Sequence, residues 1–193
     1  AVHRHLEVPG EKELSGRGVS YCAVCDGPFF KNRNIVVVGG GDSACSEAIY
    51  LTSISDKVSI IHRRDSFRAQ KAVVDKMLAA GVKPIYNSVV ESINGSVKVD
   101  SVSIKNVQTG EVSDFPCDAV FIFTGMVPQT ALVEMLPKDE FGYIKTNENM
   151  ETAMPGLFAA GDVRSKSFRQ IVTACSDGAI AANSAKHYIE NLG

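Results

Sequence analysis

The sequence has no long apolar run, no strong excess of charge and few cysteines, and each absence excludes a class of protein. No stretch of about 18 consecutive apolar residues occurs, so no membrane-spanning helix is expected. A formal net charge of −2 gives no electrostatic reason to expect nucleic acid or an anionic membrane as a partner. There is no internal repeat or low-complexity segment. The length of 193 residues suits a globular protein of one or two domains.

The cysteines are too few and too scattered for a disulfide framework in a chain of this length. Their usage favours a cytoplasmic location, where a CxxC pair is more often catalytic or metal-binding than structural. Cys45, Cys117 and Cys175 are isolated, and we interpret them as packing residues.

The remaining two cysteines, Cys22 and Cys25, form a CxxC motif that Asp26 follows directly. A zinc site would require a second CxxC or paired histidines at ligand spacing, and neither is found. The spacing also permits a small disulfide loop with perturbed thiol acidity. Asp26 could give a proton to a thiolate or take one from a thiol. Redox chemistry is therefore favoured, with a metal site and a structural disulfide as alternatives.

From residue 34 the sequence alternates short, buried apolar runs with helical patterns. It predicts strands over 34–41, 57–63 and 82–86, with helices over 42–54 and 70–81. This β-α-β-α-β order is the parallel unit of a doubly wound α/β sheet, as in a Rossmann-like domain.

The flanking segments have other patterns. Residues 1–18 have the composition of a connecting loop. The segment after residue 98 predicts an antiparallel hairpin over 99–117 with a turn at Thr109-Gly110. Buried strands are predicted over 118–125 and 157–163. A helix is predicted over 169–193 and ends at Gly193.

The stretch VVVGGGDSA places a GxGxxA motif between a buried strand and a helix. In such a turn the first glycine permits the tight bend, the second admits a pyrophosphate, and the small third residue allows close packing. The helix N-terminus then offers free N–H groups to the phosphates. The candidate phosphate-binding residues are Gly39, Gly40, Gly41, Asp42, Ser43 and Ala44. The alternative is a plain glycine-rich turn.

The second strand ends in IHRRDSFR, which bears on the choice of nucleotide. An NAD site carries an acid near this position, but Arg63 and Arg64 stand here instead, with Arg68 close behind. Guanidinium groups suit the 2′-phosphate of NADP(H), so we predict NADPH as the cofactor. The alternative is a solvated basic loop. His62 could contact the adenosine or could serve in packing.

A nicotinamide transfers hydride, whereas a disulfide accepts electrons through thiolate chemistry. The two are poor direct partners, so an intermediary that does both is expected, and a flavin has this property.

The motifs together resemble those of the bacterial low-molecular-weight thioredoxin reductases. The matching stretches are GRGVSYCAVCDGPFF, VVGGGDSA, IHRRDSFRA, FTGMVPQT and GLFAAGDVRSKSFRQIVTACSDGAIAANSA. They follow the family's order and cover nearly the whole chain.

This resemblance implies a homodimeric flavoprotein with one FAD domain and one NADPH domain in each subunit. The NADPH domain carries the CxxC and is inserted into the FAD domain. Electrons pass from NADPH to FAD, then to the CxxC disulfide, and finally to thioredoxin. On this basis residues 1–128 form the NADPH-binding domain, with 1–8 as the connector from the FAD domain, and 129–193 form the C-terminal part of the FAD-binding domain.

The resemblance also implies roles for single residues. Cys25 would be the thiol nearest the flavin, Cys22 the thiol that attacks thioredoxin, and Asp26 the acid/base. Gly125 would lie by NADPH. The FAD contacts would come from Gly161, Asp162, Val163, Arg169, Gln170 and Ile171.

Two departures from the family pattern stand out. The family begins with a strand and a GxGxxG turn that hold the FAD pyrophosphate, whereas only 21 residues precede Cys22 here. We therefore expect a fragment of a thioredoxin reductase that holds FAD weakly or not at all, is inactive alone and binds NADPH. In addition, Asp42 replaces the expected asparagine, which is unfavourable beside a pyrophosphate unless it caps the helix.

Other functions remain possible on the sequence alone. The flavoprotein of alkyl hydroperoxide reductase systems shares the CxxC but prefers NADH, which Arg63 and Arg64 argue against. A non-catalytic dinucleotide-binding fragment is a second alternative. Flavin reductases of this fold that lack a dithiol are disfavoured by Cys22 and Cys25.

Overall fold

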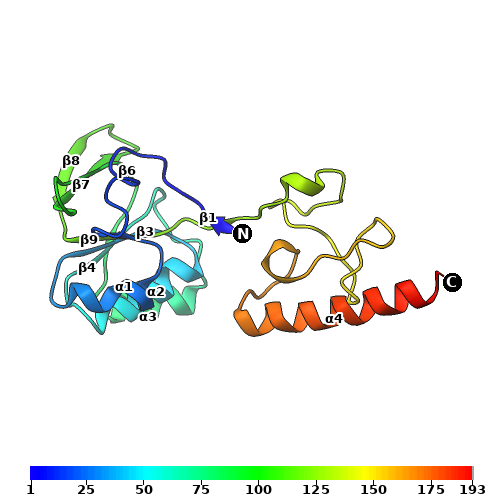
Figure 1. Cartoon of the computed structure of the whole chain (residues 1–193). Coiled ribbons are helices and arrows are strands. Elements are labelled where there is room, and N and C mark those ends of the chain that lie inside the picture. Colours follow the sequence, from blue (N-terminus) through cyan, green and yellow to red (C-terminus); the bar gives the residue numbers. More distant parts are fainter. Residues whose placement is uncertain (193) are drawn as a thin grey trace. The chain divides into compact units, whose positions relative to one another are not determined.

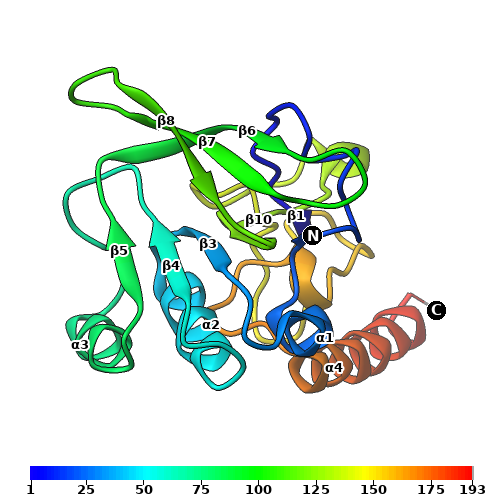
Figure 2. The ribbon, with the colours of Figure 1, turned by 90° about the vertical axis from the view of Figure 1, so that its left-hand side faces the viewer.

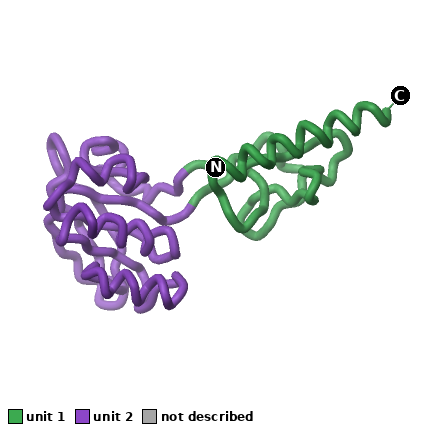
Figure 3. The backbone as a smooth tube through the Cα atoms, turned by 90° about the horizontal axis from the view of Figure 1, so that it is seen from below, with its two compact units in different colours: residues 1–2, 126–193 green, residues 3–125 purple. Residues whose placement is uncertain are grey.

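The computed structural model describes residues 1–192, which divide into two compact units (Figures 1 and 3). Unit 2 comprises His3–Gly125, and unit 1 comprises Ala1–Val2 and the chain from Met126 onward. Strands β1 (Val2–His3) and β10 (Met126–Val127) form a two-stranded sheet where the chain passes from one unit to the other. Within the described residues, no helix is both long enough and apolar enough to cross a membrane.

The core of unit 2 is a five-stranded parallel sheet. Its strands, in spatial order, are β2 (Val19–Ser20), β9 (Ala119–Phe123), β3 (Ile35–Gly39), β4 (Val58–Ile61) and β5 (Lys83–Ile85). Helix α2 (Asp42–Thr52) connects β3 to β4, and α3 (Lys71–Ala79) connects β4 to β5. The predicted β-α-β-α-β unit is therefore confirmed. Pro84 lies in β5, an edge strand, where its missing N–H is tolerated.

The two faces of this sheet are covered differently (Figure 2). Ile35 and Val37 pack against the helices, while Val36 and Val38 face the other way, as the period of a strand requires. The second face is covered by an antiparallel sheet made of β6 (Ser88–Asn94), β7 (Ser101–Asn106) and β8 (Val112–Pro116). The structure thus differs from a doubly wound fold, because the crossover from β5 to β9 is built of strands instead of a helix.

Two further sequence predictions need correction. The hairpin is correct as β7 and β8, but β6 was not predicted, because a register shift between Val90 and Ser92 breaks its alternation. The prediction of a strand over 157–163 is wrong. Only Phe158 makes a bridge, to Glu151, and Gly161–Val163 form a 3₁₀ turn, η3. A strand forms only beside another strand, and none runs along this segment in the described residues.

Unit 1 has a small core around Leu136, Ile144 and Ala159. It contains the 3₁₀ turn η2 (Ala131–Val133) and the long helix α4 (Ile171–Glu190). The predicted C-terminal helix is therefore present, although Gly193 lies outside the described residues. Within α4 the one buried residue is Asp177, so this helix is held by polar contacts more than by an apolar face.

Candidate functional site

The dithiol lies in the short helix α1 (Ala23–Asp26), just after β2 and before the 3₁₀ turn η1 (Gly27–Phe30). Cys22 and Cys25 form a disulfide, with their Cα atoms 5.3 Å apart, a separation that one helical turn supplies. The backbone N–H of Cys25 donates to Sγ of Cys22 at 3.2 Å. Cys22 is half-buried and Cys25 is exposed. Cys25 is thus the more exposed residue of the two.

Asp26 is held by Ser20, a residue that no motif in the sequence singles out. The hydroxyl of Ser20 donates to Oδ2 of Asp26 at 2.6 Å, and the N–H of Cys22 donates to the same hydroxyl at 3.1 Å. Ser20 is 5% exposed. Its position two residues before the CxxC is a signal that could have indicated a role. The acid expected to handle protons is therefore tied to the backbone of a reactive cysteine.

A buried carboxylate holds the segment before the dithiol from the other side. Glu11 is 1% exposed and accepts hydrogen bonds from the N–H of Leu6 at 3.0 Å, the N–H of Glu7 at 2.7 Å and the hydroxyl of Tyr21 at 2.6 Å. Nδ1 of His5 lies 3.2 Å away. Burial raises the pKa of Glu11, but these hydrogen bonds outweigh it and keep the pKa below its usual value. The carboxylate thereby joins the residues before Gly10 to the residue that precedes Cys22.

The other three cysteines are not disulfide-bonded. Burial, assisted by the charge of Asp42, raises the pKa of Cys45 to about 11. Burial and the charges of Asp118 and Asp100 raise the pKa of Cys117 to about 12. Both are core residues, as predicted. Cys175 is instead exposed on α4, so its interpretation as a packing residue is not supported.

The glycine turn joins β3 to α2 with no room for side chains at its first two positions. A Cβ at Gly39 would stand 2.6 Å from the carbonyl oxygen of Phe123 and 2.7 Å from Cβ of Ala44, and Gly39 has φ of 157°. Helix and strand therefore approach closely at Ala44, as the motif predicts. Gly41 is the N-cap of α2, and among residues 1–192 no side chain makes a capping hydrogen bond to the free N–H groups there. The N-terminus of α2 is thus open to an anion.

His62 packs against this turn. A Cβ at Gly40 would lie 2.1 Å from its ring, and the other side of the ring stacks on Phe67, with centroids 5.3 Å apart. Burial, together with the charges of Arg64 and Arg63, lowers the pKa of His62. The structure therefore shows His62 packed between the glycine turn and Phe67, and a contact with the adenosine stays a prediction. Its Nε2 is buried and has no hydrogen-bond partner among the described residues.

Backbone contacts fasten the loop after β4 to the glycine turn. The N–H groups of Arg68 and Ala69 both donate to the carbonyl of Gly40, at 2.8 and 3.2 Å. Oδ1 of Asp42 accepts from the N–H of Gln70 at 2.9 Å. Asp42 follows the N-cap of α2 and bonds the entry of α3, so it does not cap its own helix. The carboxylate is engaged with this loop.

The loop carries the three predicted arginines. Arg63, Arg64 and Arg68 are all exposed, and none has an acidic partner within 4.0 Å among residues 1–192. A guanidinium nitrogen of Arg68 lies 3.6 Å from where a Cβ at Gly41 would be, and Ser43 is exposed in the first turn of α2. Gly125, with φ of 118°, follows β9 at the same carboxyl edge of the sheet. The edge therefore combines an open helix N-terminus with uncompensated positive charge.

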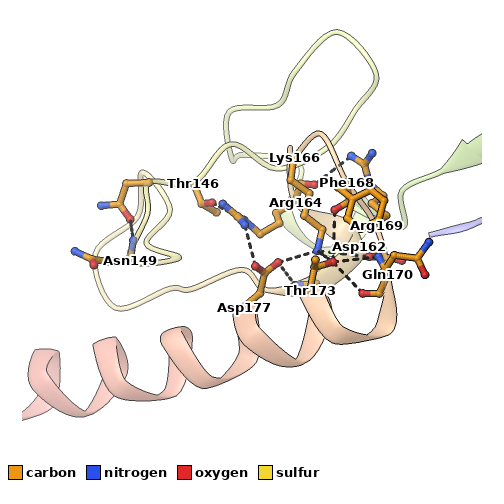
Figure 4. A network of polar contacts seen from close by, with 12 residues as sticks. Thr146, Asn149, Asp162, Arg164, Lys166, Phe168, Arg169, Gln170, Thr173 and Asp177 are labelled. Atoms are coloured by element: carbon orange, nitrogen blue, oxygen red, sulfur yellow. Dashed lines mark hydrogen bonds and ion pairs between the residues drawn. The ribbon is translucent and has the colours of Figure 1, made fainter. Parts of the chain in front are cut away.

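In unit 1 a second polar cluster surrounds η3 (Figure 4). Asp177 accepts from the N–H of Gly161 at 3.1 Å, from Arg164 at 3.0 Å and from Lys166 at 3.0 Å. Burial raises the pKa of Asp177, but these donors outweigh it and hold the pKa below its usual value. Asp177 could not be identified from the sequence, because its partners lie more than ten residues away in the chain.

The predicted FAD contacts lie around this cluster. Asp162 Oδ1 makes no hydrogen bond among the described residues, but it lies 3.6 Å from Nζ of Lys166 as an ion pair. Arg169 Nε is buried without a hydrogen-bond partner among the described residues, which fits a polar ligand at this place. The guanidinium of Arg169 lies 3.7 Å from the centre of the Tyr143 ring. Gln170 and Ile171 are exposed where α4 begins, and Val163 packs on the unit 1 core. No group of three or more metal-ligating side chains is found in the described part of the chain.

Comparisons with known proteins agree with this arrangement. The family model for pyridine nucleotide-disulphide oxidoreductases matches residues 1–178. The chain is 53% identical over its whole length to the thioredoxin reductase of Treponema pallidum and 52% identical to that of Bacillus subtilis, spanning 63% and 62% of those proteins. The crystal structure of Lactococcus lactis thioredoxin reductase, described as the FR conformation, is 48% identical. It matches 98% of this chain and 63% of its own, with a TM-score of 0.84. The chain therefore belongs to the pyridine nucleotide-disulphide oxidoreductase family and spans less than two thirds of these relatives.

Proposed function

We propose that this chain provides the NADPH-binding and dithiol-bearing part of a thioredoxin reductase, whose activity is the NADPH-dependent reduction of thioredoxin. The observation that carries this proposal is the Cys22–Cys25 disulfide beside Asp26, in a chain that also offers an open anion site. The relatives named thioredoxin reductase match this chain from end to end. A cytoplasmic, homodimeric parent protein is part of the same proposal.

The nucleotide site is the carboxyl edge of the parallel sheet in unit 2. The glycine turn and the N-terminus of α2 would receive the pyrophosphate, and Arg63, Arg64 and Arg68 would bind the 2′-phosphate. Three exposed guanidinium groups without acidic partners support NADPH over NADH. When bound, NADPH supplies a hydride, and a flavin converts hydride transfer into the electron transfer that a disulfide accepts.

Unit 1 would contribute to flavin binding. The buried Nε of Arg169, which has no hydrogen-bond partner among the described residues, supports this assignment, as do the η3 turn and the exposed start of α4. We assign residues 1–128, with 1–8 as the connector, to the NADPH-binding domain, and 129–193 to the C-terminal part of a FAD-binding domain.

The dithiol would act by thiol–disulfide exchange with thioredoxin. A thiolate of the reduced pair attacks the substrate disulfide, and Asp26 handles the proton. The resemblance assigns the attack on thioredoxin to Cys22.

This function can be tested on the chain itself. We expect the purified chain, reduced with dithiothreitol and desalted, to convert about one equivalent of oxidised thioredoxin to its dithiol form. The Cys22→Ser/Cys25→Ser double variant should convert none, and Cys175→Ser should behave as the unsubstituted chain. Mass spectrometry after alkylation counts the thiols of both proteins. If the reduced chain leaves thioredoxin oxidised while its own thiols stay reduced, the proposed function is wrong.

A further inference from the structure

We infer that Ser20 is a positioning residue for the proton-transfer step of thiol–disulfide exchange, because it holds one oxygen of the Asp26 carboxyl group and leaves the other free. The inference concerns the mechanism of the dithiol and rests on the proposed function. Ser20 is 5% exposed, and it lies in β2, which pairs with β9 in the parallel sheet. The sheet therefore fixes the position from which the Ser20 side chain acts.

The hydrogen bonds of the Ser20 hydroxyl have one consistent arrangement. The group has a single proton and two acceptors in reach, Oδ2 of Asp26 at 2.6 Å and the carbonyl of Cys22 at 3.4 Å. The shorter contact has the length of a charge-assisted O–H to carboxylate hydrogen bond, so the proton points at Asp26. A lone pair of the same oxygen accepts the N–H of Cys22 at 3.1 Å. The hydroxyl thus links the backbone of a reactive cysteine to the acid.

The two oxygens of Asp26 are consequently not equivalent. Oδ2 is bound to Ser20, whereas Oδ1 has no hydrogen-bond partner among residues 1–192. A carboxyl group that rotated freely would present either oxygen in many directions. Held by Ser20, it presents Oδ1 as the atom that takes and gives a proton. General acid–base catalysis depends on this kind of fixed geometry.

The exchange can be written with its atoms balanced. The attacking cysteine gives its proton to the Asp26 carboxylate, and its thiolate attacks the substrate disulfide, so one S–S bond forms to the substrate and the substrate S–S bond breaks. The leaving sulfur takes this proton from Asp26. The second cysteine then gives its proton to Asp26 and attacks the mixed disulfide, releasing the second substrate sulfur, which takes that proton. Two electrons pass from the dithiol to the substrate, and the Cys22–Cys25 disulfide forms again.

The need for an acid depends on the leaving sulfur, which separates positioning from mere structural support. Thioredoxin and glutathione disulfide release thiolates of ordinary basicity, which benefit from protonation. The aromatic disulfide 5,5′-dithiobis(2-nitrobenzoate) releases a weakly basic thiolate that leaves without it. Loss of acid positioning should therefore slow the reactions with thioredoxin and glutathione disulfide and leave the rate with the aromatic disulfide nearly unchanged. Misplacement of the dithiol itself would slow all three.

The experiment uses the reduced 193-residue chain in rapid-mixing assays with these three disulfides. Ser20→Ala should slow the reactions with thioredoxin and glutathione disulfide about tenfold, and should change the aromatic disulfide rate by less than about twofold. Ser20→Thr, which keeps the hydroxyl, should restore most of the rate. Asp26→Asn should show the same substrate dependence, and adding Ser20→Ala to it should cause little further loss, because both changes remove one function.

Equal slowing of all three disulfides by Ser20→Ala, or no slowing of any, overturns the inference. Full additivity of Ser20→Ala with Asp26→Asn also overturns it. If the unsubstituted chain fails with thioredoxin, the proposed function is wrong. The Ser20 inference then stands or falls on the contrast between glutathione disulfide and the aromatic disulfide.

Discussion

Replacing Arg63 and Arg64 together with alanine is expected to weaken NADPH binding by about 100-fold or more and NADH binding by less than about threefold. Charge-assisted hydrogen bonds from guanidinium groups to a phosphate dianion are strong, and the two arginines have no acidic partner that competes for them among residues 1–192. NADH has no 2′-phosphate, so it loses little. Titration calorimetry of the chain with each nucleotide measures both affinities.

The matched control is Arg33→Ala. Arg33 is also an exposed arginine of unit 2, but it precedes β3, at the end of the strand opposite the glycine turn, and lies 3.9 Å from Asp118. It should change neither affinity. Equal losses for NADPH and NADH in the double variant would mean that the arginines bind no 2′-phosphate, and the NADPH assignment would then fail.

Replacing Glu11 with glutamine is expected to lower the free energy of unfolding by about 3 kcal/mol at pH 7. The side chain is 1% exposed, and its two oxygens accept from Leu6, Glu7 and Tyr21. A glutamine places an NH₂ group against one of these donors, which leaves a buried group unpaired. Urea unfolding followed by circular dichroism gives the change.

The loss should also depend on pH, with a definite sign. The pKa of Glu11 lies below its usual value in the folded chain, so the carboxylate stabilises the fold above the ordinary glutamate pKa of about 4.3. That contribution disappears as the pH falls through the folded pKa, and the free energies of unfolding of the two proteins should then converge.

Glu13→Gln, at an exposed neighbouring position, should cost less than about 0.5 kcal/mol. Tyr21→Phe, which removes one donor, should cost about 1–2 kcal/mol. A Glu11→Gln loss that persists unchanged in acid would contradict the carboxylate's role.

Local patterns in the sequence were sufficient for the elements that position the nucleotide site. The apolar run before Gly39 and the helical stripe after it define β3 and α2, because both depend on residues close in the chain. The arginines after β4 could be identified for the same reason. The strand predicted over 157–163 failed because apolar composition shows burial but not whether another strand lies alongside.

The contacts that fix the functional groups could not be predicted in this way. Glu11 lies ten residues before Tyr21 in the sequence. The residues between them follow no helical or strand period that would predict this contact. Asp177 bonds Gly161, Arg164 and Lys166 across a turn that no local pattern defines. Ser20 is closer to Asp26 in sequence, but its hydrogen bond depends on how β2 leads into α1. Such pairings follow from the tertiary fold.

The most direct test of where the cofactor binds is a titration of the isotope-labelled chain with NADPH, followed by the backbone amide signals in NMR spectra. We expect the largest changes at residues 39–44 and 63–68, with small changes over residues 126–192. The amide signals around Cys22 and Cys25 serve as a check that the dithiol segment stays folded. If saturating NADPH leaves the glycine turn and the arginine loop unchanged, or shifts only residues after 126, the nucleotide does not bind where we have assigned it.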